Sequence, residues 1–209
     1  MNKKIYQFIL ALLAIMIGLY PIIYLFLDSS VGFLSSKGSE LLESNLWRGA
    51  FYLHILFGGI SLLCGWSQFF PRWRNRHLKF HRNLGKIYLG SVTFSGIGGL
   101  YMAFFANGGL ISTFGFGSLA MFWLITTWKA FFEISAGRVD SHQVWMMRSY
   151  ALTFAAVTLR IWLPLFTGPM GIEFIQAYKA ISWLCWVPNL ILIEILIVKI
   201  QSNTKVAIR

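Results

Sequence analysis

Four histidines are the residues of this sequence best suited to bind an iron or another transition metal. His81 and His142 each stand at the start of a separate apolar segment, His54 lies well inside another, and His77 falls between two segments. A haem iron takes axial ligands from opposite faces, so two imidazoles at a similar level on different helices could hold one haem. Zinc or copper would need further ligands. His81 and His142 are therefore the candidate metal ligands, and a purely structural role for them stays open.

Two arginines within apolar sequence are candidates for binding an anion. Ionisable groups at membrane depth are costly and mark a functional hypothesis. Arg160 could anchor a haem propionate, a lipid phosphate or a quinone oxygen, because a guanidinium binds anions through two hydrogen bonds. It shares its predicted depth with His54, which predicts a small outer polar pocket, and snorkelling to the surface is the alternative. Arg148 could hold a cofactor or pair with Glu194, and Gln68 is expected to line the polar interior.

The elements that must position these side chains are membrane-spanning helices. The 209 residues are 57% hydrophobic and only 12% charged, whereas a soluble domain has about 25% charged residues. This composition excludes a soluble enzyme, a disordered chain and a disulfide-stapled secreted domain. Spans of roughly 20 apolar residues are predicted at Ile5–Leu27, Trp47–Phe70, Gly85–Ala106, Leu110–Ile134, Val144–Phe166 and Ile175–Ile200. The sequence therefore predicts an all-α polytopic bundle of about six transmembrane helices in one domain, residues 1–209.

The basic residues predict the orientation of this bundle. Six Lys and Arg residues and no acidic residue lie between positions 72 and 86. The protein is expected in the cytoplasmic membrane of a bacterial cell. Because Lys and Arg are enriched in cytoplasmic loops, this segment and both termini are expected to face the cytoplasm. That topology accounts for most of the net charge of +11, so no nucleic-acid partner is expected. The basic segment is instead expected to attract anionic lipid head groups.

Other residues carry structural expectations. Lys129 and Glu133 are four residues apart on one predicted helix and could pair with each other. Cys64 and Cys185 fall at different depths, so no disulfide is expected between them. Kinks are expected at three prolines within the helices, Pro21, Pro164 and Pro188.

Several separated motifs carry a family resemblance. They are His54–Gly58, Ser67–Phe69, His81–Tyr88, His142–Leu152, Thr158–Arg160 and Trp183–Asn189. Together they resemble an uncharacterised bacterial family of predicted membrane proteins, domain of unknown function 2306, over roughly residues 45–195. This resemblance implies a multi-pass membrane protein and no particular reaction.

A shorter stretch is similar to another family. His54-xxx-Gly58, Gln68, and His81-xxx-Gly85 resemble two consecutive helices of the b-type cytochrome ferric reductases that take electrons from ascorbate. The similarity implies that His54 and His81 are axial haem ligands, in a family where four histidines on four helices hold two haems. Because this chain offers His142 as a third histidine and no matching fourth, a single inner haem on His81 and His142 is the form expected here.

The leading hypothesis is a membrane oxidoreductase that passes electrons through one b-type haem, with a quinone or another redox protein as its partner. His81 and His142 would bind the iron, and Arg160 or Arg148 would hold a propionate or a quinone. Two alternatives from other classes stay open. One is a non-enzymatic scaffold or assembly factor whose polar residues only bridge helices, and the other is a small transporter or lipid-handling protein that uses the space around His54 and Arg160.

Overall fold

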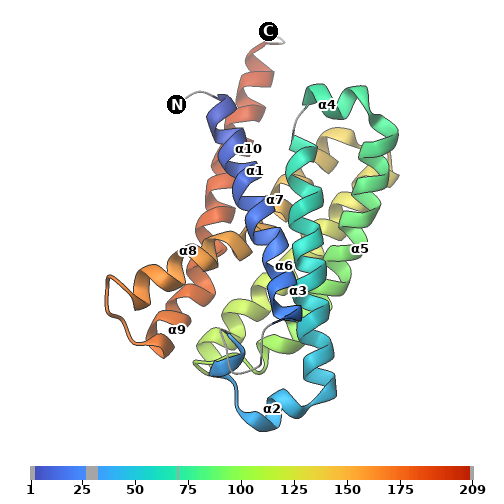
Figure 1. The fold of residues 1–209 in the computed structure, drawn as a ribbon. Coiled ribbons are helices and arrows are strands. Elements are labelled where there is room, and N and C mark those ends of the chain that lie inside the picture. The colour runs from blue at the N-terminus through green and yellow to red at the C-terminus, as the bar shows by residue number, and fades with distance from the viewer. Residues whose placement is uncertain (1–2, 27–32, 70, 208–209) are drawn as a thin grey trace.

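The computed structural model describes residues 3–26, 33–69 and 71–207, and within these ranges every regular element is a helix. This confirms the all-α prediction. The two ends of the chain lie at the same end of the bundle, together with the short helix α4 (Pro71–Arg76), while α2 (Ser39–Glu43) lies at the opposite end (Figure 1). The end with the termini is called the inner end here, after the predicted orientation, which itself stays a prediction.

Four helices form the centre of the bundle. They are α3 (Asn45–Gly65), α5 (Leu78–Ala103), α6 (Leu110–Ser135) and α7 (Val139–Thr153). Helix α3 packs along α5, α5 along α6 and α6 along α7, and α7 returns to α3. In this ring α5 and α7 are diagonal partners. Side chains directed from both helices toward the bundle axis can therefore meet.

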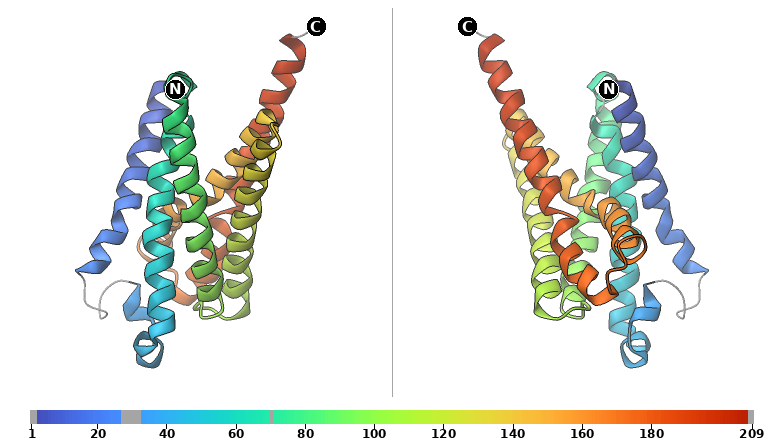
Figure 2. Two further views of the ribbon diagram at one scale, coloured as in Figure 1. Left: turned by 90° about the vertical axis from the view of Figure 1, so that its right-hand side faces the viewer. Right: turned by 90° about the vertical axis from the view of Figure 1, so that its left-hand side faces the viewer.

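Four further helices surround this centre. Helix α1 (Lys3–Leu19) packs on α3 and continues as a 3-10 segment from Tyr20 to Leu25. The other three, α8 (Ala155–Thr167), α9 (Phe174–Leu184) and α10 (Val187–Ala207), follow α7. Helices α8 and α9 form a hairpin beside the lower half of the bundle (Figure 1). Figure 2 shows that α6 and α10 tilt away from α3 and α5 toward the inner end.

Five of the six predicted spans are long and apolar enough to cross a membrane: Ile5–Leu25, Asn45–Gln68, Leu110–Ser135, Val139–Thr167 and Phe174–Ser202. The sixth, α5, has 26 residues but does not meet this standard of apolarity. Helix α5 can be more polar because it lies between α3 and α6, which bury its Ser91 and Ser95. The chain is therefore a multi-pass membrane protein, and α5, the least apolar of the six predicted spans, lies in the ring of four.

The predicted fifth helix differs from the structure in two ways. It begins at Val139 rather than Val144, and it breaks into α7 and α8 at Phe154. The break is not at Pro164, which lies inside α8. The hydroxyl of Thr153 donates to the backbone oxygen of Ser149 at 3.0 Å, and such back-bonding often bends a helix.

The predicted sixth helix is also broken, here next to a proline as expected. Helix α9 ends at Leu184 and α10 begins at Val187, so that Pro188 lies in the first turn, where its missing N–H costs little. The Asn189 amide donates to the backbone oxygens of Cys185 at 2.9 Å and Ala151 at 3.3 Å. Backbone groups freed within a membrane need such partners, so Asn189 stabilises both breaks.

Two smaller expectations are confirmed. Pro21 stands at the start of the 3-10 segment that ends the first helix. Cys64 and Cys185 are both buried and free.

Candidate functional site

The two candidate metal ligands occupy equivalent positions at the inner end. His81 is the fourth residue of α5 and His142 the fourth of α7. His142 Nδ1 lies 2.8 Å from the backbone oxygen of Ala130, and His81 Nδ1 is hydrogen-bonded to Gln68 Oε1. A carbonyl oxygen only accepts, so each Nδ1 carries a proton, and in the neutral imidazole each Nε2 then keeps its lone pair. Imidazoles that bind metals are oriented in this way.

His81 is held in its neutral form by its surroundings. Burial lowers the pKa of its imidazole, and the positive charges of Arg74 and Arg82, with that of His142 when it is protonated, lower the pKa further. A neutral imidazole is the form that can bind a metal ion.

Gln68 positions His81. Its amide nitrogen donates to Ser67 Oγ at 3.2 Å and lies 3.5 Å from the backbone oxygen of Cys64, while its oxygen accepts from the His81 ring. The sequence placed Gln68 in the polar interior, and it is buried there. The sequence did not predict the hydrogen bond between Gln68 and His81, which the fold creates.

Arg148 forms the pair expected with Glu194. Its Nε and Nη2 atoms lie 2.6 Å and 2.9 Å from the two carboxylate oxygens, and its guanidinium lies 4.5 Å from the centre of the Trp145 ring. This bidentate geometry neutralises both charges and ties α7 to α10. The contact matches the bridging alternative for Arg148, and it occupies two of the three guanidinium nitrogens.

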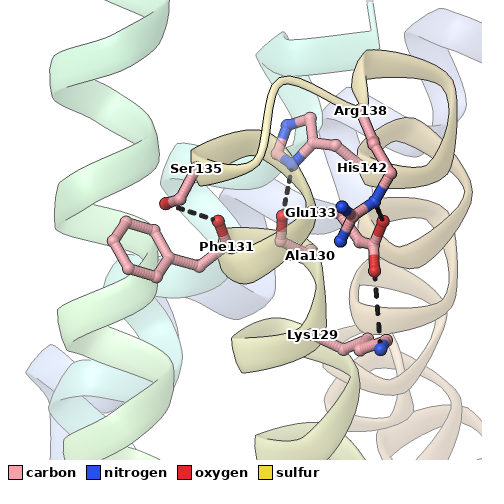
Figure 3. A network of polar contacts seen from close by, with 7 residues as sticks. All are labelled: Lys129, Ala130, Phe131, Glu133, Ser135, Arg138 and His142. Atoms are coloured by element: carbon pink, nitrogen blue, oxygen red, sulfur yellow. Dashed lines mark hydrogen bonds and ion pairs between the residues drawn. The ribbon is translucent and has the colours of Figure 1, made fainter.

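A second ionic cluster fixes the turn from which α7 begins (Figure 3). Glu133 lies 3.4 Å from Lys129 Nζ, which confirms that pairing, and 2.5 Å from Arg138 Nε, which the sequence did not predict. The Glu133 carboxylate raises the pKa of Arg138. Arg138 is the residue before α7, and its backbone oxygen accepts from the N–H of His142 at 3.0 Å. The cluster therefore helps to set the position of His142.

A belt of hydroxyl groups crosses the middle of the bundle. Tyr88 donates or accepts at 2.7 Å with both Ser149 and Thr153, Trp123 donates to Thr153 at 2.8 Å, and Thr127 lies 2.6 Å from Ser149. The sequence interpretation missed this belt. The signal available was two polar pairs spaced four residues apart, Trp123 with Thr127 and Ser149 with Thr153, because this spacing puts both members on one helix face.

The other candidates line a cavity toward the opposite end, here called the outer cavity. It has a volume of about 710 Å³, and His54, Arg160 and Lys37 are the basic residues among its mainly apolar and aromatic walls. His54 and Arg160 are thus brought together, as their predicted depth suggested. His81 and His142 do not belong to this lining. The fold therefore divides the candidate residues into two groups, with His54 and Arg160 at the outer cavity and His81 and His142 at the inner end.

His54 is held by a close contact between α3 and α5. Its Nδ1 donates to the backbone oxygen of Ser95 at 2.9 Å, and Ser95 Oγ donates back to the His54 oxygen at 2.7 Å. A Cβ atom at Gly99 would lie 2.7 Å from His54 Nδ1, and one at Gly98 would lie 2.8 Å from the backbone oxygen of Ala50. Only glycine allows the two helices to approach so closely.

Arg160 is held without a carboxylate. One of its terminal nitrogens donates to the backbone oxygen of Ala156 at 2.9 Å, and its guanidinium lies 4.7 Å from the centre of the Tyr20 ring. In the described ranges, the three ion pairs are those of Lys129, Arg138 and Arg148. Arg160 therefore presents an uncompensated positive charge beside the outer cavity.

Comparison with known proteins identifies the family and nothing more specific. A family model described as predicted membrane protein (DUF2306) matches residues 51–197, a range that contains every candidate cofactor-binding residue discussed above. No curated protein and no solved structure matches the chain. The resemblance to ferric reductases gains no support and stays a prediction. Because the family model covers well over half of the sequence, the chain belongs to the DUF2306 family of predicted membrane proteins.

Proposed function

We propose that this multi-pass membrane protein binds one b-type haem near its inner end and transfers electrons through it. The observation that carries the proposal is the pair of imidazoles on the diagonal helices α5 and α7. His81 and His142 stand at equivalent positions, and each has its Nδ1 proton committed to an oxygen atom. Both Nε2 atoms are left to serve as ligands, as a bis-histidine iron requires. Haem would supply one-electron chemistry.

The surrounding charges suggest which residues would hold the haem propionates. Arg74 and Arg82 are close enough to His81 to lower its pKa, whereas Arg148 is bound to Glu194 and Arg160 lines the outer cavity. We therefore assign the propionates to Arg74 and Arg82 in place of the two arginines favoured by the sequence. Guanidinium groups suit this role because they bind carboxylates through paired hydrogen bonds.

The proposal includes a place in the cell. The protein would lie in the cytoplasmic membrane of a bacterial cell, and the basic segment 72–86 supports an inner end that faces the cytoplasm. Anionic lipid head groups would bind this segment. A quinone or a redox protein would exchange electrons with the haem.

A spectroscopic experiment tests the proposal. The protein is produced in cells with ample haem, purified in a non-ionic detergent, and measured by reduced-minus-oxidised absorbance and a haem assay. We expect a b-type spectrum at about one haem per chain, because two axial ligands hold one iron. His81→Ala and His142→Ala should each remove the haem. His54→Ala and His77→Ala are the matched controls and should retain it.

Two outcomes would contradict the proposal. A wild-type protein that is folded and colourless would exclude haem and favour the scaffold or lipid-handling alternatives. Haem retained in full by both His81→Ala and His142→Ala would place the cofactor elsewhere. Size-exclusion elution and helical circular dichroism identify variants that have simply failed to fold.

A further inference from the structure

The outer cavity has a strongly one-sided charge. Arg160 and Lys37 line it, and no Asp or Glu is among its lining residues within the described ranges. Lys37 Nζ donates to the backbone oxygen of Phe105 at 2.6 Å and to Asn107 Oδ1 at 2.9 Å, both of which are neutral acceptors. Among the described residues, the partners of Arg160 are likewise a backbone oxygen and an aromatic face. A charge at membrane depth is normally paired, so this cavity favours an anion from outside the described chain.

A third donor that lines the same cavity lacks an acceptor among the described residues. Trp47 lines the cavity and is 1% exposed, and its indole N–H has no hydrogen-bond partner among the described residues. Buried tryptophan N–H groups usually find a partner, and an unsatisfied one costs free energy. Trp47 is on α3 whereas Arg160 is on α8. Two separate elements thus contribute unused donors to one cavity, which suits a ligand rich in acceptor oxygens.

The size and the walls of the cavity limit what this ligand can be. A volume of about 710 Å³ lies within the range of known ligand pockets. At roughly 30 Å³ per water-sized group, it holds roughly two dozen non-hydrogen atoms. Apart from these donors, the walls are mainly rings and aliphatic chains such as those of Phe51, Leu119 and Leu163, and the hydroxyls of Ser95 and Thr153 are already bonded to backbone oxygens. These walls suit an apolar chain better than a second polar group.

We propose that the outer cavity binds a single-chain membrane amphiphile with an anionic headgroup, either a carboxylate or a phosphate. Arg160 would bind the headgroup through paired hydrogen bonds. Lys37 adds a second positive charge to the same cavity, and the aromatic walls receive the chain. This site is separate from the inner histidines, so the proposal is independent of haem binding.

A competition experiment tests the site with three probes that share an 18-carbon monounsaturated chain. Oleate and oleoyl lysophosphatidate carry a carboxylate and a phosphate, and monoolein is neutral. The full chain is freed of lipid in a non-ionic detergent, mixed with equal amounts of one anionic probe and monoolein, and examined by native mass spectrometry. We expect the anionic adduct to exceed the neutral one by at least about tenfold, the ratio that 1.4 kcal/mol produces. The stronger of the two anionic probes identifies the headgroup.

Two variants determine whether Arg160 causes this preference. Arg160→Met is expected to bring the anionic-to-neutral ratio close to one while monoolein still binds. Arg48→Met is the matched control, because Arg48 is an exposed arginine of α3 outside the cavity lining. It should leave the ratio unchanged.

Two outcomes would overturn the proposal. One is equal binding of anionic and neutral probes by the wild type. The other is a preference that persists unchanged in Arg160→Met. If Arg160→Met fails to fold, Arg160→Lys replaces it, and a ratio that does not fall in this variant contradicts a bidentate headgroup contact.

Discussion

The inner and outer ends of this bundle hold their charged residues in opposite ways. At the inner end Glu133 is shared by Lys129 and Arg138, and Arg148 is bound by Glu194. At the outer end the cations of the cavity have neutral acceptors, and the helices there are held by close packing of glycines against His54. A charged side chain that already has a partner of opposite charge ties helices together. A charged side chain that lacks such a partner and lines a cavity is available to a ligand.

The same contrast separates the histidines. His81 and His142 present a free Nε2 atom near the inner surface, among arginines that could hold acidic groups. His54 is wedged between α3 and α5 and lines a mostly apolar space. Residues of one type therefore have different chemical surroundings at the two ends.

The largest effect on stability is expected from the packing at the outer end. Gly98→Ala would place a Cβ atom 2.8 Å from the backbone oxygen of Ala50, which cannot move without shifting α3. We expect a loss of about 1–3 kcal/mol in the free energy of unfolding, as for other overpacked sites. Gly90→Ala in the same helix has no atom within 4 Å of its new Cβ. It should be neutral or slightly stabilising when both are measured by thermal unfolding in detergent. Equal effects of the two changes would show that the α3–α5 contact is not tight.

A smaller effect separates paired from unpaired arginines. Arg148→Met leaves Glu194 without its bidentate partner, and we expect a loss of about 1–2 kcal/mol, between the values for exposed and buried pairs because Glu194 is 42% exposed. Arg160→Met removes a charge that has no carboxylate partner, so the ligand-free protein should be unchanged or slightly more stable. The double variant Arg148→Met with Glu194→Leu should recover most of the loss. A large loss in Arg160→Met without ligand would show that its charge is compensated within the protein.

The smallest effect is a dependence on pH at Lys37. Burial lowers the pKa of this ammonium to about 8 from its ordinary value of 10.5. Between these two values the folded state has released a proton that the unfolded state still binds, so the free energy of unfolding should rise with pH across this window and not below it. Thermal unfolding of the wild type and of Lys37→Met should differ in slope only there. Parallel curves would place the pKa of Lys37 near its ordinary value.

Much of the fold could be predicted because its signal is local. Apolar runs located the spans, and Pro21 and Pro188 indicated where two helices change. The break at Phe154 could not be predicted in this way. No proline or glycine marks it, and it depends on the Thr153 hydroxyl together with an Asn189 side chain that arrives from another helix.

The candidate site was predicted as a set of residues but not as an arrangement. The sequence by itself determined that the chain lies in a membrane and which polar residues are exceptional there, because the cost of burying a polar group depends on the type of residue. Only the tertiary structure decided that Gln68 joins His81, that Arg148 joins Glu194, and that Arg160 lines a cavity with no carboxylate among its described lining residues. Successive residues of a helix point about 100° apart, so the packing of the helices determines which side chains meet.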